Sequence, residues 1–267
     1  MKTLLDVYRA QFKAVLEEQL QYRVLMTIGL LWLVLQPVIY LAVWSAVARA
    51  HGGGVGGYTL AQFAAYFLAI MLVNHLTFTW APVYWEGRVR RGLLSPLLLL
   101  PIHPIHHDLA ATLMYKLMTL VVILPAVAGL VVAFRPALHP TPWMIVAFLI
   151  ALLLAVALRF LVEWTLGLLA LWVTRMSAVR QLYAVVLLFL SGQVAPLSLF
   201  PPQVQTATAL LPFRWMVAFP VDVLLGHLTA GQTLIGLAAQ GTWVVLTLAL
   251  LAIAWRAGLR RYAAVGL

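Results

Sequence analysis

The residues of this chain that could carry chemistry are few, and the most notable are Arg159 and Glu163. A spacing of four places both side chains on one face of a helix. They lie in the middle of a long apolar stretch, where an isolated charge is costly. The pair could line a translocation route or couple transport to protons, or it could hold two helices together. The sequence leaves both interpretations open.

Three histidines and a carboxylate form the second candidate group: His103, His106, His107 and Asp108. Imidazole and carboxylate are zinc ligands, but a proline-broken stretch with this spacing supplies no tetrahedral set. The chain has no cysteine, which removes thiolate ligands and disulfides as well. We therefore expect no metal site.

Other catalytic arrangements are also missing. Ser191 lacks the preceding glycine of a nucleophile elbow. The pair Glu17 and Glu18 is followed by Arg23 one residue too late to match intramembrane CAAX-type proteases, and it lies outside any apolar stretch. No lysine follows a glycine, so there is no phosphate-binding loop. The sequence predicts a protein that is not an enzyme and has neither an ATPase site nor a cofactor of its own.

The composition identifies the environment of these residues. Of 267 residues, 64% are apolar and 9% are charged, and the mean hydropathy is +1.02. Soluble domains carry about 45–50% apolar and about 25% charged residues, so this is an integral membrane protein. A net charge of +10 would suggest nucleic acid in a soluble protein. In a membrane protein, basic residues collect at the cytoplasmic ends of spans, so we expect a lipid bilayer and no nucleic acid as partner.

Six stretches are long and apolar enough to span a bilayer, which requires about 20 residues for a hydrocarbon core of about 30 Å. They predict an all-α integral membrane protein with a single transmembrane domain over residues 1–267. The predicted spans are residues 24–47, 60–84, 109–134, 143–173, 179–195 and 233–255.

The basic residues between the spans predict the orientation. Twelve fall on the side that carries both termini, and three fall on the other side, which places both termini in the cytoplasm. The twelve are Lys2, Arg9, Lys13, Arg23, Arg88, Arg90, Arg91, Arg175, Arg180, Arg256, Arg260 and Arg261, and the three are Arg49, Arg135 and Arg214.

Two cytoplasmic segments are not spans. Residues 1–23 repeat apolar side chains at spacings of three and four, with charged residues between them. This pattern predicts an amphipathic helix that lies in the membrane interface, or that packs on protein. Residues 85–108 carry three arginines and then an apolar run that Pro96 and Pro101 interrupt, so the run cannot cross the bilayer. We expect a short helix there, lying along the membrane or docked on a partner.

The external segment 196–228 is apolar but contains five prolines. Two helical pieces, about residues 203–211 and 215–225, fit between the prolines, and each is too short to span. Broken helices at membrane depth require protein or water to satisfy the freed backbone groups. We predict external re-entrant helices before the last span.

Two stretches carry a resemblance to a known family. RGLLSPLLLLPIHP, residues 91–104, is similar to the cytoplasmic segment of permease subunits of type 2 ABC exporters, although the expected arginine before Pro101 is a leucine. SGQVAPLSLFPPQVQTATALLPF, residues 191–213, is similar to their Ser-Gly-x-x-x-Pro-Leu-x-x-Phe-Pro signature. The whole layout resembles a bacterial subfamily with six spans.

The resemblance implies a mechanism and its partners. Two permease chains, identical or paralogous, would form the translocation pathway in the bacterial plasma (inner) membrane. Two separate ATPase subunits would bind ATP and Mg²⁺ and dock from the cytoplasm. Coupling to the ATPase would involve Glu86, Arg88, Arg90, Arg91, Leu93 and Leu94, and an external gate would involve Pro196, Phe200, Pro201, Pro212 and Phe213.

The side chains expected to line the pathway indicate the chemical class of the substrate. The external loops are short and the predicted spans hold few polar side chains. An amphipathic or hydrophobic molecule, such as a drug or a lipid, suits these walls better than a sugar chain. The alternative is an ion- or proton-coupled secondary transporter that uses Arg159 and Glu163.

Overall fold

The computed structural model describes residues 4–21, 23–173 and 175–262, with the side chains of residues 4, 5, 7 and 18–33 left out of the description. Lys2 and the side chains of Glu18 and Arg23, named above, lie outside the described part. The described chain is almost entirely helical, apart from a hairpin of two strands, β1 (Gly54–Val55) and β2 (Tyr58–Thr59).

The helices follow in this order: α1 (Leu4–Gln21), α2 (Arg23–Ala50), α3 (Leu60–Thr77), α4 (Ala81–Arg90), α5 (Leu94–Leu98), α6 (Pro104–Phe134), α7 (Pro142–Leu168) with a 3₁₀ turn η1 (Leu169–Leu171), α8 (Met176–Leu190), a 3₁₀ turn η2 (Leu197–Leu199), α9 (Pro202–Leu210), α10 (Pro212–Met216), α11 (Ala218–Leu224) and α12 (Ala230–Arg261).

Four helical stretches of the described chain are long and apolar enough to cross a membrane: Leu60–Arg90, Pro104–Phe134, Pro142–Leu171 and Ala230–Arg261. Two shorter apolar helices, Val34–Ala50 and Met176–Leu190, fall in the regions of the other two predicted spans. The chain is therefore a mostly helical protein with several candidate membrane spans, and the count of six stays a prediction.

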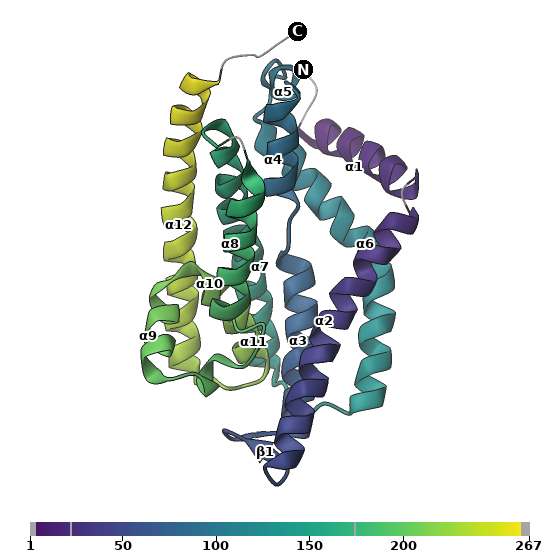
Figure 1. Cartoon of the computed structure of the whole chain (residues 1–267), viewed down its shortest axis with the longest axis vertical. Coiled ribbons are helices and arrows are strands. Elements are labelled where there is room, and N and C mark those ends of the chain that lie inside the picture. Colours follow the sequence, from purple (N-terminus) through teal and green to yellow (C-terminus); the bar gives the residue numbers. More distant parts are fainter. Residues whose placement is uncertain (1–3, 22, 174, 263–267) are drawn as a thin grey trace.

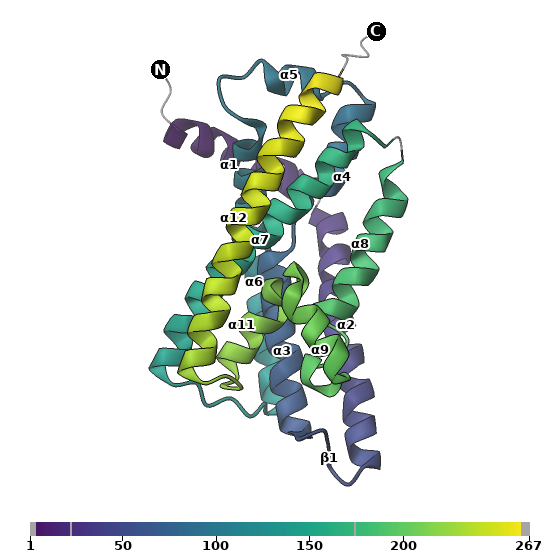
Figure 2. The ribbon, with the colours of Figure 1, turned by 90° about the vertical axis from the view of Figure 1, so that its left-hand side faces the viewer.

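The elements divide between two ends of an elongated bundle (Figure 1). Helices α4 and α5 and the last turns of α12 lie at one end, and the β1–β2 hairpin lies at the other. Helix α1 lies across the bundle near the first end and packs on α6. The view turned by 90° shows the same separation, with α9 and α11 in the half of the bundle that carries the hairpin (Figure 2).

Helix α3 lies at the centre of the bundle. Most of its side chains are buried, including the large rings of Phe63, Tyr66 and Phe67. A helix that is apolar on all sides is expected in such a central position. Around it, α7 packs extensively on α12, and α11 packs on both α3 and α7.

Helix starts follow local sequence signals. Thr59 and Thr229 cap α3 and α12 through reciprocal bonds with Gln62 and Gln232, which is the capping-box arrangement. Prolines begin α6, α7, α9 and α10, where the missing N–H costs no hydrogen bond.

Several helix boundaries differ from those expected. The predicted span 60–84 is interrupted between Thr77 and Ala81. The predicted loop 85–108 is largely helical, because it contains the end of α4, all of α5 and the first turn of α6. The predicted piece 215–225 is split at Val217, and α8 ends at Leu190 rather than at residue 195.

Candidate functional site

A broken helix is the centre of the candidate site. In a continuous helix the N–H of residue 82 would bond to the carbonyl of Phe78. Pro82 has no N–H, and its ring would clash with that carbonyl. The helix therefore ends at Thr77 and resumes as α4 at Ala81. Membrane interiors tolerate such a break only where protein or water satisfies the freed backbone groups.

Lys116 of α6 and Glu163 of α7 satisfy these groups. The Lys116 Nζ donates to the carbonyl oxygens of His75, at 3.2 Å, and Phe78, at 2.5 Å. The N–H of Thr79, which would otherwise bond to the His75 carbonyl, donates to Glu163 Oε2 at 3.2 Å. A cation thus faces the carboxyl end of α3 and an anion faces the chain entering α4, which matches the two helix dipoles.

Arg159 completes this network. Its Nε donates to Glu163 Oε1 at 2.7 Å, and its Nη1 donates to Asn74 Oδ1 at 2.7 Å and to Thr77 Oγ1 at 2.9 Å. The hydroxyl of Tyr183 on α8 donates to the same Glu163 oxygen at 3.1 Å. Both members of the ion pair are buried, so the pair joins α3, α7 and α8.

These contacts bear on the two interpretations of Arg159 and Glu163. Both carboxylate oxygens accept hydrogen bonds, and the guanidinium is spread over three acceptors on α3 and α7. Such a pair stabilises the helix break, because its members bind both a backbone N–H of the break and side chains of α3. The arrangement therefore favours the structural interpretation.

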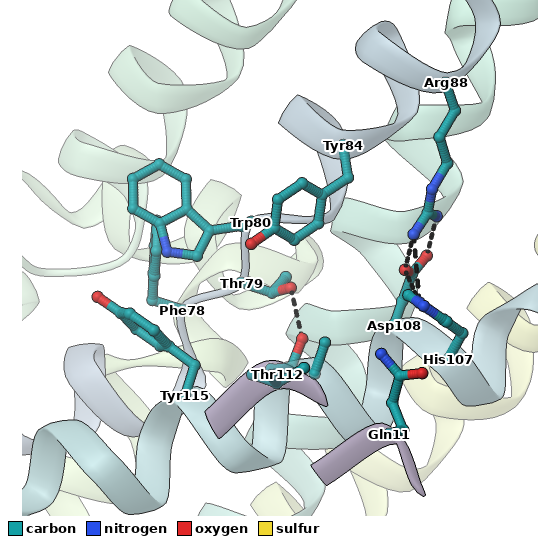
Figure 3. A pocket seen from close by; sticks show the side chains of 12 residues that line it. Gln11, Phe78, Thr79, Trp80, Tyr84, Arg88, His107, Asp108, Thr112 and Tyr115 are labelled. Atoms are coloured by element: carbon teal, nitrogen blue, oxygen red, sulfur yellow. Dashed lines mark hydrogen bonds and ion pairs between the residues drawn. The ribbon is translucent and has the colours of Figure 1, made fainter. Parts of the chain in front are cut away.

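A cavity of about 210 Å³ adjoins the break, between α1, α4 and α6. Figure 3 shows Phe78, Trp80, Tyr84 and Tyr115 grouped on one side of it, and Arg88, His107, Asp108 and Gln11 on the other. Thr79 and Thr112 lie between these groups, joined by a hydrogen bond of 3.2 Å. The cavity is therefore amphipathic, with one aromatic side and one polar side. Ligand pockets span about 300–1,000 Å³, so a cavity of this size suits a headgroup rather than a whole drug-sized molecule.

Arg88 and Asp108 tie α4 to α6. The guanidinium binds the carboxylate in a bidentate manner, at 2.5 and 2.7 Å, and the indole N–H of Trp164 donates to Asp108 Oδ2 at 2.9 Å. Trp164 also packs edge-to-face on Trp85 and near Trp255, with ring centroids 4.9 and 5.6 Å apart. These contacts fix α4 against α6, α7 and α12.

The six residues expected to couple to an ATPase fall into two sets. The Arg88 side chain is only 11% exposed and Leu94 is buried, so neither is available to a partner. Arg90 is 67% exposed, and Arg91 and Leu93 are exposed as well. Glu86 forms ion pairs with Arg90, at 3.6 Å, and with Arg180, which joins α4 to α8.

The exposed edge of the α4–α5 segment continues beyond these residues. Leu99 is 86% exposed, and Pro96, Leu100 and Pro101 are also exposed. We use the name coupling edge for the exposed residues Arg90, Arg91, Leu93, Pro96, Leu99, Leu100 and Pro101. It combines two guanidinium groups with an apolar strip at the end of the bundle that carries α5.

The three histidines do not converge. His103 accepts a hydrogen bond from the N–H of Ile105 and so caps α6, and burial, then the neighbouring His106, holds the pKa of His103 below its usual value. His106 faces the Tyr8 hydroxyl at 3.1 Å, and His107 lies beside Asp108. Among the described residues, no group of three or more possible ligands could hold a metal ion.

The five residues predicted for an external gate lie along the segment from just before η2 to α10. Pro196 is buried before η2, Phe200 and Pro201 link η2 to α9, and Pro212 begins α10. Phe213 packs on Tyr183, with ring centroids 6.1 Å apart.

The loop that follows α8, residues 191–195, is held in place by hydrogen bonds from a tyrosine hydroxyl and a tryptophan indole. Tyr66 donates to the carbonyl of Gly192 at 2.7 Å, and Trp44 donates to that of Val194 at 2.8 Å. Gly192 has φ +84°, and a Cβ there would lie 2.6 Å from the Tyr66 hydroxyl. Glycine is therefore required in the Ser-Gly pair for both backbone conformation and space.

Sequence reasoning missed the residues that repair the helix break. Lys116, Asn74 and Thr79 each looked like an isolated polar residue in or near an apolar stretch. Two signals could have identified them: the position of Pro82 inside a predicted span, and a lone lysine in the middle of another. An ionisable residue inside a membrane span is expected to have a charged group or a backbone carbonyl as its partner.

Comparison with known proteins adds one finding. The model of a family described as ABC-2 family transporter protein matches residues 31–266. Among curated proteins, none matches the chain closely enough to count as a relative.

Proposed function

Because the chain belongs to the ABC-2 family of transporter proteins, we propose that it is the membrane permease subunit of an exporter driven by separate ATPase subunits. The match covers nearly the whole chain and confirms the family that the two sequence segments indicated. Permeases of this kind work with an ATP-binding partner subunit. The direction of transport, the substrate and the stoichiometry are our proposals.

The observation that carries the coupling proposal is the coupling edge. Arg90, Arg91 and Leu99 are exposed, although the surrounding side chains Trp85, Arg88 and Leu94 are buried. Exposed aliphatic groups flanked by guanidinium groups are typical of a surface that another protein covers. We propose that the ATPase subunit docks there, with an acidic or polar surface facing the arginines.

Movement of the docked ATPase would reach the spans through fixed contacts. Helix α4 is a separate segment because the chain breaks between Thr77 and Ala81. The Arg88–Asp108 pair joins it to α6, and Trp85 against Trp164 joins it to α7. We propose that α4 and α5 move with the ATPase and tilt α6 and α7. The network around Lys116 and Glu163 ties the end of α3 to these two helices.

We further propose an amphipathic substrate that enters from the cytoplasmic leaflet. Its support is the cavity of about 210 Å³ beside α1, with aromatic rings on one side and polar groups on the other. This lining suits a headgroup that carries a hydrocarbon or ring system. Transport of a hydrophilic polymer by the purified complex, with amphipathic compounds ignored, would overturn this part of the proposal.

The complex we propose contains two permease chains, identical or paralogous, and two ATPase subunits in the bacterial plasma membrane. Both termini would face the cytoplasm, as the distribution of basic residues predicts. In that orientation the coupling edge faces the cytoplasm and the β1–β2 hairpin faces outward.

The test is purification of the solubilised chain from its host, followed by identification of co-purifying subunits and an ATPase assay. We expect a stoichiometric ATPase that is lost, or reduced several-fold, in the double variant Arg90→Ala with Arg91→Ala. The matched control is Arg256→Ala with Arg260→Ala, which removes the same charge from exposed positions of α12.

The control separates a docking surface from a general effect of charge. Retention of the ATPase by the α12 control and its loss from the α4 variant supports docking at the coupling edge. Equal loss from both variants contradicts that location. Isolation of a chain that transports without any nucleotide-binding partner contradicts the proposal as a whole.

A further inference from the structure

We propose that a cavity at the hairpin end of the molecule binds a ligand that carries an oxyanion, either a phosphate or a carboxylate, through Arg214. The cavity measures about 400 Å³ and lies between the β1–β2 hairpin, the first turn of α3, η2 and the short helices α9 to α11. It is remote from the coupling edge, and the proposal does not depend on how transport is driven.

Arg214 lines this cavity without an anionic partner. Its Nε atom is buried and makes no hydrogen bond, and the part of the chain that the structure describes provides no ion pair for its guanidinium. The charge lies over the ring of Trp215, 5.5 Å from the centroid. Ring contact offsets only part of the cost of burying an arginine.

The largely buried Arg88 and the buried Arg159 show what is missing at the partly buried Arg214. Arg88 reaches Asp108 and Arg159 reaches Glu163, each with charge-assisted bonds of 2.5 to 2.7 Å. Arg214 has the same donors, but no carboxylate among the described side chains lies within ion-pair distance of it. A guanidinium fork binds phosphate and carboxylate in a bidentate manner.

Asp222, the carboxylate that the described residues contribute to the cavity lining, is directed elsewhere. Asp222 of α11 forms an ion pair with His227, with Nδ1 and Oδ1 3.4 Å apart. Asp222 therefore leaves the guanidinium unpaired. It also places a carboxylate and an imidazole at the cavity wall, which would favour a ligand that carries a donor as well as an oxyanion.

Neutral hydrogen-bonding groups complete the lining. The amide oxygen of Gln62 accepts from the N–H and the hydroxyl of Thr59, which fixes the orientation of the amide. The hydroxyl groups of Tyr58 and Ser198 bond to each other at 3.1 Å. An oxyanion bound at Arg214 would find these donors within the same cavity.

Two sources supply this chemistry on the proposed external side: the headgroup of an outer-leaflet phospholipid, and a phosphate or carboxylate of a dissolved or exported molecule. The two share the oxyanion and differ in whether it must be delivered with a lipid. One experiment with two arms separates them.

The experiment measures the unfolding temperature of the purified chain, with any subunits that accompany it, in maltoside micelles free of phosphate. In the first arm, inorganic phosphate replaces chloride at constant ionic strength. In the second, phosphatidylglycerol is added, with diacylglycerol as the uncharged lipid. We expect a rise of about 3 °C in at least one arm, because a ligand that binds only the folded state stabilises it.

Three variants place the effect at Arg214. Arg214→Gln should abolish the rise, and Arg214→Lys should keep only a weakened response because an ammonium cannot form the bidentate fork. Arg49→Gln, at an exposed arginine that bonds only to the Ser45 carbonyl of its own helix, should respond like the unmodified chain. Without ligand, Arg214→Gln should unfold at the same or a higher temperature, since it removes an unpaired charge.

The outcomes divide clearly. A response to phosphate identifies a dissolved oxyanion, and a response to phosphatidylglycerol alone identifies a lipid headgroup. The proposal is overturned if neither arm raises the unfolding temperature, or if Arg214→Gln responds as fully as Arg49→Gln. A ligand-free Arg214→Gln protein that unfolds several degrees lower would show that the arginine serves the fold instead.

Discussion

At the scale of single residues, ionisable groups in the spans repair the backbone. Pro82 removes one hydrogen bond of a helix, and Lys116 and Glu163 bind the groups that the break leaves behind. Arg159 then pairs with Glu163 and reaches α3. Buried charges in membrane proteins often mark a transport route, but Lys116, Arg159 and Glu163 are each committed to a backbone or side-chain partner.

Lys116→Met tests this account of the helix break. The change leaves the carbonyls of His75 and Phe78 without a donor in an apolar setting, and it also removes a positive charge near Glu163. Each unsatisfied acceptor costs about 1–3 kcal/mol, so we expect a loss of about 2–5 kcal/mol in the free energy of unfolding. Thermal or denaturant unfolding in micelles measures it. Lys13→Met, at an exposed position of α1, is the control and should change stability by less than about 0.5 kcal/mol.

His103 predicts a pH dependence. Burial lowers its pKa in the folded protein, and its neutral ring accepts the capping hydrogen bond at the start of α6. The unfolded chain therefore binds a proton more readily, so the stability from this group is complete above the ordinary histidine pKa of about 6.5 and is lost as the pH falls through the lowered value.

Substituting His103 with asparagine isolates that contribution. Asparagine is a good N-cap and does not titrate, so His103→Asn should lose less stability than the unmodified chain between pH 7 and pH 5. Unfolding temperatures measured across this range check the difference. Parallel curves for the two proteins would show that folding does not change the pKa of His103.

At the scale of elements, close approach of helices depends on glycine at particular positions. A Cβ at Gly236 of α12 would lie 2.0 Å from the Phe219 ring of α11, whereas a Cβ at Gly241 of the same helix meets nothing within 4 Å. The same substitution is therefore expected to affect stability differently at the two positions.

Gly236→Ala should destabilise the protein by about 1–3 kcal/mol, because the ring of Phe219 must move out of a packed core. Gly241→Ala should leave stability unchanged or raise it by up to about 1 kcal/mol through helix propensity. Unfolding of both variants under one set of conditions measures the contrast. Equal effects would contradict the packing of α11 on α12.

The sequence predicted the broad outline of these elements. The apolar stretches could be read from their length, the external helices from the positions of prolines, and the amphipathic first helix from its periodicity. The break after Thr77 could not, because a single Pro82 inside an apolar run is compatible with a kinked helix. Its repair depends on Lys116 and Glu163 from two other helices, and a local pattern can mark such residues without showing which groups they bind.

The candidate site was predicted less completely than the fold. The spacing of Arg159 and Glu163 indicated their pairing, but not their bonds to Asn74 and Thr77. Arg88, Arg90 and Arg91 looked equivalent in sequence. Only the position of Asp108 on α6 distinguishes the buried Arg88 from the two exposed arginines.

At the scale of the whole molecule, exposed features lie at two opposite ends. The coupling edge gathers Arg90, Arg91 and Leu99 at the end that carries α5, and the Arg214 cavity lies at the hairpin end. The amphipathic cavity beside α1 lies next to the helix break and is also lined by α4. This arrangement suits a subunit that receives a mechanical input at one end and presents its pathway toward the other.

The most direct test of the central claim is disulfide-independent cross-linking from single cysteines, which is clean because the chain has no cysteine of its own. Leu99→Cys, at a position 86% exposed on the coupling edge, is compared with Leu210→Cys, at a position 72% exposed at the end of α9. A reagent with a maleimide at one end, which reacts with the cysteine, and a photoactivated diazirine at the other, which inserts into a neighbouring chain, is applied to the complex in membranes. The account predicts a covalent product with the ATPase subunit from position 99 and none from position 210. Cross-linking from position 210 alone, or from neither position in a complex that hydrolyses ATP, would contradict it.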